Sequence, residues 1–213
     1  MADNDCKQHT WGVNEMVNAH DVAAHILRTK SSLSGVSLQK LLYYAHAWHL
    51  VAFDSPLFSE RIEAWKLGPV VYDVWDSHRN QRVVSVQDVL SRCSTEVLNE
   101  SEAAVVDAVV ELFSDLDQWK LADLVHEERP WIDAYHRDDK WGHRISDEAI
   151  KEFYASVAAT SPENRGVSRV PRLPEARISY VSKGEYDELF GDLDTPDDVS
   201  GFLAALQASR NHG

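Results

Sequence analysis

The fold is decided by residues 37–53, SLQKLLYYAHAWHLVAF, which are helical in pattern and apolar around most of the helix. The apolar side chains of this stretch are Leu38, Leu41, Leu42, Tyr44, Ala45, Ala47, Trp48, Val51 and Ala52. A narrow polar stripe interrupts them, made of Gln39, Tyr43, His46 and His49. Because a helix that is apolar nearly all round is usually buried, we expect this helix to form the centre of the domain, with Ser37 as its N-cap.

Helical patterns on both sides of this segment predict a mainly α-helical fold. Asn18 is the expected N-cap of a helix that ends near Lys30, and Ser146 is the expected N-cap of a closing helix. A further helix should open near Pro69, because a proline suits a first helical turn, and its inward residues should be Val71, Tyr72 and Trp75. The remaining expected elements are an extended segment before that helix, a short strand at 83–86, a helix at 102–116, a short helix ending near His126, and a second short helix after a turn through Arg129-Pro130.

These elements predict a compact multi-helix domain with one or two short strands, plus a C-terminal extension. We divide the chain into a loosely held N-terminus at 1–17, a helical domain at 18–160 and the extension at 161–213. The extension has an arginine block, Arg165 to Arg177, followed by an acidic block and FLAALQ at 202–207. It is too poor in apolar residues to fold alone convincingly, so it either orders on a partner or stays a flexible terminus.

The chain is acidic and suited to a reducing compartment. Its 213 residues carry a formal net charge of −14, which repels phosphate backbones and favours encounters with basic proteins. Nucleic acid is therefore an unexpected partner. The two cysteines have no paired spacing, and no apolar run approaches the roughly 20 residues that a membrane span needs. We expect a cytoplasmic protein with no membrane partner.

No catalytic motif is present, and no catalytic residue, metal or cofactor is predicted. His46 and His49 lie one helical turn apart and could offer two metal ligands, with His126, His136 or His143 completing the set. A hydrogen-bonded or solvent-facing pair is the favoured interpretation, because no carboxylate accompanies them at that spacing. The stretch RDDKWGHR at 137–144 is typical of a solvated, charge-alternating loop.

Aromatic residues are concentrated between 43 and 75, where only Lys40, Arg61 and Lys66 supply nearby positive charge. An aromatic surface that stacks on single-stranded nucleic acid would need more lysine or arginine between its aromatic residues. Core packing therefore explains Tyr44 and Trp48 better. Trp65, Tyr72 and Trp75 are candidates for a partly exposed patch, since Trp and Tyr are enriched at interface hot spots. Burial in the core remains the favoured interpretation for each of them.

The ordered blocks LQKLLYYAHAWHL, PLF, EAWKLGPVVYDVW, LVHEERPWIDAY and ISDEAIKEFY resemble the Panacea domain, or SocA-like antitoxin domain, of toxin–antitoxin systems of bacteria and phages. The resemblance covers about residues 18–158. It implies a mainly helical domain without known catalytic activity that neutralises a toxin encoded beside it. The positions that mark the domain, mainly for structural reasons, are Leu38, Leu41, Leu42, Tyr44, Trp48, Trp65, Gly68, Pro69, His126, Pro130, Trp131 and Tyr154.

Direct binding of the cognate protein toxin is the function that this resemblance favours. In one branch of the family the antitoxin delivers its toxin to a cytosolic AAA+ protease, so a proteolytic adaptor is the alternative. A metal-dependent hydrolase using His46, His49 and His126, and a DNA-binding autorepressor using Arg165 to Arg177, are further alternatives. The candidate toxin-contact residues are Trp65, Tyr72, Trp75, Arg169, Arg172, Tyr186, Phe190 and Phe202.

Overall fold

The computed structural model describes residues 16–94, 98–136, 142–159, 170, 171 and 173. This part of the chain is mainly helical, which confirms the predicted fold class. The α-helices are α1 (Ala19–Lys30), α2 (Gly35–Phe53), α3 (Tyr72–His78), α4 (Glu100–Phe113), α5 (Gln118–His126), α6 (Arg129–Tyr135) and α7 (Asp147–Ala159). The strands are β1 (Ser32–Ser34), β2 (Ile62–Trp65), β3 (Gly68–Val71), β4 (Val83–Ser85) and β5 (His143–Ile145). Two single-turn 3-10 helices, η1 (Val86–Asp88) and η2 (Leu90–Arg92), follow β4.

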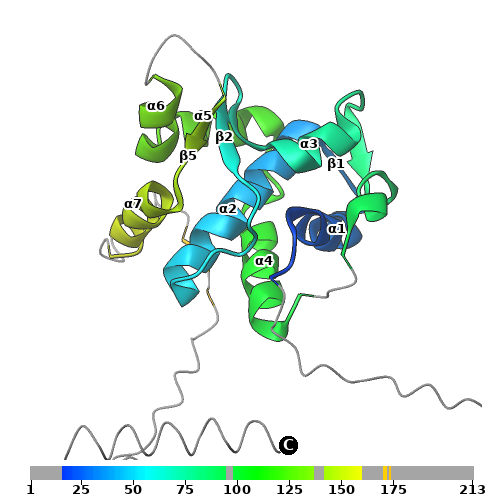
Figure 1. Ribbon diagram of the computed structural model, residues 1–213, viewed down its shortest axis with the longest axis horizontal. Coiled ribbons are helices and arrows are strands. Elements are labelled where there is room, and N and C mark those ends of the chain that lie inside the picture. The colour runs from blue at the N-terminus through cyan, green and yellow to red at the C-terminus, as the bar shows by residue number, and fades with distance from the viewer. Residues whose placement is uncertain (1–15, 95–97, 137–141, 160–169, 172, 174–213) are drawn as a thin grey trace, which may run out of the picture. The chain divides into compact units, whose positions relative to one another are not determined.

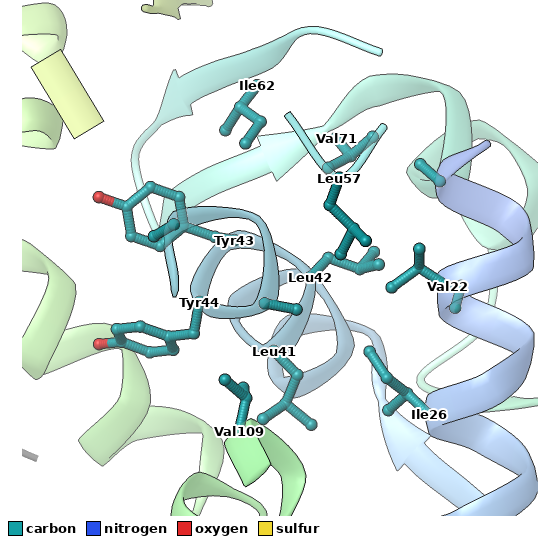
Figure 2. Close-up of a cluster of buried hydrophobic side chains, with 14 of the residues drawn as sticks. Val22, Ile26, Leu41, Leu42, Tyr43, Tyr44, Leu57, Ile62, Val71 and Val109 are labelled. Atoms are coloured by element: carbon teal, nitrogen blue, oxygen red, sulfur yellow. The ribbon is translucent and has the colours of Figure 1, made fainter. Parts of the chain in front are cut away.

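Helix α2 is the centre of the domain, as its apolar circumference predicts. Figure 1 shows it running through the middle of the fold, with α1 and α4 on one side and α7 on the other. In Figure 2 the side chains of Leu41, Leu42 and Tyr44 leave α2 in different directions, and all three are buried. Leu42 points toward α1, whose Val22 and Ile26 face it across the core.

The predicted polar stripe of α2 is also buried, a feature that the sequence pattern does not show. Its members are Gln39, Tyr43, His46 and His49, each at most 6% exposed. Strand β3 and helix α7 pack over this side of α2 and provide polar partners for it. Lys40, which lies beside the stripe, is only 1% exposed. All sides of α2 are therefore covered, and the polar groups survive because the covering elements hydrogen-bond to several of them.

Two of the three predicted helix N-caps are confirmed. The Asn18 side chain accepts hydrogen bonds from two backbone N–H groups of α1 and forms a capping box with Asp21. Ser146 Oγ accepts a hydrogen bond from the N–H of Ala149 in α7. The predicted cap of α2 is wrong by one turn: Ser34, not Ser37, is the N-cap, because its side chain accepts from the Ser37 N–H.

Pro69 lies in a strand, so the prediction that a helix opens there is wrong. Strand β3 pairs antiparallel with β2, with Pro69 opposite Ala64, and β2 pairs on its other edge with β5. Because β3 is an edge strand, the missing N–H of Pro69 leaves no ladder partner unsatisfied. The helix begins three residues later, at Tyr72.

The inward face of α3 differs from the predicted one for the same reason. Val71 is buried, as predicted, but it ends β3 rather than lying on the helix. In α3 the buried positions are Val74 and His78, while Tyr72 is 39% exposed and Trp75 is half-buried. The shift in the helix start therefore turns two large aromatic side chains toward the surface.

Most other predicted elements are confirmed, with ends that differ by a few residues. They are the strand β4, and helices α4, α5, α6 and α7. The loop predicted at 137–144 is partly wrong, because His143 and Arg144 belong to β5, which pairs with β2; residues 137–141 lie outside the described residues. Val170 and Leu173 pack against the core. No described helix is both long and apolar enough to cross a membrane.

Candidate protein interface

A buried polar cluster lies between α2, α7 and the start of α6. Glu128, 9% exposed, accepts hydrogen bonds from the hydroxyls of Tyr44 at 3.1 Å and Tyr154 at 2.7 Å. Burial raises the pKa of Glu128 to about 7, and the two tyrosine hydrogen bonds and the charge of Lys40 act in the opposite direction. Burial also raises the pKa of Tyr154 well above its usual value. This cluster joins α2, α7 and the start of α6, three segments distant in sequence.

Lys40 is buried beneath the hairpin of β2 and β3. Its Nζ donates a hydrogen bond to the carbonyl oxygen of Pro69 at 2.8 Å. Burial lowers the pKa of Lys40 to about 7, and the negative charge of Glu128 opposes that shift. The lysine therefore ties the central helix to the hairpin that carries Trp65.

Gly68 is the residue that lets the hairpin approach Lys40 so closely. Its φ of +102° is a conformation that other residues rarely adopt. A Cβ at this position would lie 2.6 Å from Val125 Cγ2, 2.7 Å from Lys40 Cε and 2.8 Å from Lys40 Nζ. The structural role that the resemblance implies for the Gly68-Pro69 pair thus has a physical account: the glycine makes room, and the proline carbonyl receives the lysine.

Above this hairpin, Trp65, Tyr72 and Trp75 form one aromatic cluster at the surface. The ring centroids of Trp65 and Trp75 are 4.9 Å apart, and those of Tyr72 and Trp75 are 5.6 Å apart. Trp65 Nε1 donates to Glu63 Oε2 at 2.9 Å, and its carbonyl accepts from Trp131 Nε1 at 3.0 Å. The three predicted contact candidates therefore lie together, and two hydrogen bonds fix the position of Trp65.

The cluster borders a groove of about 910 Å³, which we call the tryptophan groove. Its walls include the rings of Trp65, Trp75 and Trp119. The complete set of lining residues is Ser34, Gly35, Val36, Gln39, Lys40, Trp65, Lys66, Leu67, Val70, Trp75, His78, Arg79, Gln81, Arg82, Val83, Gln118 and Trp119. Four of these are lysine or arginine and none is acidic, although the whole chain carries a net charge of −14.

Sequence reasoning missed the far wall and the positive rim of this groove. Trp119 is 59% exposed, more than either of the other two tryptophans that line the groove. One signal was available: in α5 the buried residues are Leu121, Ala122 and Val125, and Trp119 lies off that face. Arg79 and Arg82 had no comparable signal, because only the tertiary structure brings the segment after α3 beside α5.

The histidines considered as metal ligands have other roles. His46 Nε2 lies 3.1 Å from Asp147 Oδ1, and His49 Nδ1 lies 2.8 Å from the carbonyl oxygen of Ser55. The favoured prediction of a hydrogen-bonded pair is confirmed, whereas solvent exposure is not, since both are buried. His126 packs its ring on Trp131 at a centroid distance of 4.3 Å. Among the residues that the structure covers, no three His, Cys, Asp or Glu side chains are grouped as metal ligands.

The other residues that mark the domain are buried, in agreement with the structural role that the resemblance implies. Leu41, Leu42, Tyr44 and Trp48 are all buried in the core, and Pro130 and Trp131 are buried at the start of α6. The candidate contacts Arg169, Arg172, Tyr186, Phe190 and Phe202 lie outside the described residues.

Comparison with known proteins identifies the family. The family described as "Antitoxin SocA-like, Panacea domain" matches residues 38–132. The chain is also 36% identical over 171 residues to Antitoxin SocA of Caulobacter vibrioides, an alignment that covers 71% of this chain and 91% of that protein. No solved structure matches the present chain. With the predicted helical fold and the buried marker residues in place, the chain belongs to the SocA-like antitoxin family and contains its Panacea domain.

Proposed function

We propose that the protein neutralises a toxin encoded beside its own gene by binding that toxin directly, without catalysis, in the cytoplasm. The observation that carries this proposal is the tryptophan groove with its adjoining cluster of Trp65, Tyr72 and Trp75. Large aromatic side chains at a concave surface are typical of binding hot spots, because they bury much area with few rotatable bonds. Membership of an antitoxin family supports a toxin as the occupant.

The test combines growth with co-purification. The neighbouring open reading frame is expressed alone and together with this protein, and the tagged antitoxin is then purified from the rescued cells. We expect arrested growth without the antitoxin, and rescue with a stoichiometric complex when both are present. Rescue without a complex, accompanied by loss of the toxin that stops when AAA+ proteases are deleted, would replace direct neutralisation with protease delivery. A harmless neighbour would contradict both.

The C-terminal extension is proposed to contribute to specificity by folding on the toxin. A segment that orders on binding can cover a large surface, and residues 161–213 have separated basic and acidic blocks that suit such contacts. Deleting 176–213 keeps Val170 and Leu173, which pack on the core. We expect this truncation to weaken neutralisation while the unfolding temperature of the domain is preserved. Full neutralisation by the truncated protein would contradict the specificity role.

A further inference from the structure

We propose that the tryptophan groove receives an acidic segment of the toxin that also carries an aromatic or large aliphatic side chain. This inference rests on the proposed function and adds the surface and the chemistry of the partner. The lining contains Lys40, Lys66, Arg79 and Arg82, and no aspartate or glutamate. In a chain with 35 acidic and 21 basic residues, a lining with four basic residues and no acidic one marks a local reversal of charge.

The cations at the rim are available to a partner. Lys66 and Arg82 are exposed, and within the described residues neither side chain has an ion pair. Arg79, with 56% of its side chain exposed, lies 3.5 Å from Asp76, which is also paired with Arg92 at 3.0 Å. An incoming carboxylate would therefore meet Lys66 and Arg82, which have no ion pair among the described residues, and Arg79, whose partner Asp76 is also bound to Arg92.

Two buried side chains that line the groove, Gln39 and His78, each have a nitrogen without a hydrogen-bond partner in the part of the chain that the structure describes. Gln39 is 2% exposed; its Oε1 accepts a hydrogen bond from the Val71 N–H at 2.7 Å, while its Nε2 has no partner among the described residues. His78 is 3% exposed, and its Nε2 has no partner there either. Buried donors are normally satisfied. An acceptor such as a carboxylate oxygen that enters the groove would satisfy the Gln39 amide.

The walls explain why the partner should also bring a large apolar side chain. Trp119 is 59% exposed and Leu67 is 43% exposed, and Trp65 and Trp75 add two further large rings to the lining. A carboxylate alone would leave these rings in water. An aromatic or aliphatic residue beside the acid would remove their apolar area from water, which favours binding.

Single-stranded nucleic acid also stacks on aromatic rings beside cations, but the charge distribution favours a peptide. Four basic residues and no acidic residue line the groove, so the rest of the chain has a net charge more negative than −14. A polyanion that extends beyond the groove would be repelled by that surface. A folded protein can place one acidic segment in the groove and turn its own basic regions toward the remainder.

The experiment measures the affinity of the full-length protein for the toxin encoded by the neighbouring open reading frame, by isothermal titration calorimetry at two salt concentrations. The test variant is Arg79→Glu with Arg82→Glu. The matched control, Arg28→Glu with Arg129→Glu, makes the same change in net charge at exposed positions of α1 and α6. Unfolding temperatures of both variants check that each remains folded.

We expect the groove variant to bind at least roughly tenfold more weakly than wild type and to lose most of the salt dependence, because like charges at an interface are strongly unfavourable. The control should change affinity less than twofold. Trp119→Ala, at an exposed position, should also weaken binding roughly tenfold.

Three outcomes would overturn the inference. Equal affinity of wild type and the groove variant would remove the groove from the interface while the proposed function stands. Failure of wild type itself to bind would remove the proposed function and this inference together. Binding of a fluorescent oligo(dT) by wild type that the groove variant abolishes, with toxin affinity unchanged, would assign the groove to nucleic acid instead.

Discussion

Replacing Gly68 with alanine should destabilise the domain far more than an ordinary glycine substitution. The backbone at Gly68 has a φ of +102°, and an added Cβ would lie 2.6–2.8 Å from Val125 and Lys40. Contacts that short essentially never occur, so Lys40 or the hairpin must move. Movement of Lys40 would break its 2.8 Å hydrogen bond to the Pro69 carbonyl and leave a buried amine without an acceptor.

Two costs combine in this variant. A non-glycine residue in a sparsely populated backbone conformation costs about 1–3 kcal/mol, and a buried polar group that loses its partner costs about 1–3 kcal/mol. The free energy of unfolding should therefore fall by about 4 kcal/mol. For a domain of this size, about 2–4 °C is lost for each kcal/mol, so the melting temperature should fall by roughly 8–16 °C.

Thermal and urea unfolding followed by circular dichroism measure this effect, and Gly142 offers a matched control. Its φ is +81°, but the nearest atom to an added Cβ is Glu63 Oε2 at 3.4 Å, an ordinary contact. Gly142→Ala should therefore show only the backbone cost. The difference between the two variants isolates the overlap with Lys40 and Val125.

A double-mutant cycle with Lys40→Ala tests the cause directly. Removing the Lys40 side chain deletes two of the three atoms that the new Cβ would overlap, so Gly68→Ala should cost at least about 1 kcal/mol less in that background. The reasoning is refuted if Gly68→Ala is no more destabilising than Gly142→Ala, or if the cycle shows no coupling between residues 68 and 40.

Three further predictions concern the buried cluster and a helix cap. Burial raises the pKa of Glu128 from 4.5 to about 7. The contribution of Glu128 to stability is therefore complete below pH 4.5 and is lost as the pH rises through about 7. Relative to Glu128→Gln, the free energy of unfolding of the wild type should fall by up to roughly 3 kcal/mol over that range. A pH-independent difference in urea unfolding would contradict this. Tyr154→Phe removes the 2.7 Å hydrogen bond to Glu128 and should cost about 1–3 kcal/mol at neutral pH, and unchanged urea unfolding would exclude a stabilising bond. Asn18→Ala removes the capping box of α1 and should lower the free energy of unfolding by about 1 kcal/mol. A melting temperature equal to that of the wild type would contradict a stabilising role for this cap.

The proposed toxin-binding surface was only partly predictable from the sequence. Trp65, Tyr72 and Trp75 could be named because Trp and Tyr favour interfaces, although burial was the favoured interpretation of each. The structure leaves Tyr72 39% exposed and Trp65 and Trp75 half-buried. Trp119, Arg79 and Arg82 could not be joined to them, since no local pattern indicates which distant segments lie side by side.

The sequence by itself determined most of the helices, the N-caps Asn18 and Ser146, and the central place of residues 37–53. Periodicity and capping are local properties, set by side chains within a few residues of one another. Pairing between strands is not local, and for that reason Pro69 was predicted to open a helix when β2 holds it in an edge strand. Only the tertiary structure decided that Lys40 is buried beneath Gly68, and that residues 34–40, 65–83 and 118–119 meet in one groove. Those contacts depend on packing across long sequence separations, which a single sequence does not encode in any local pattern.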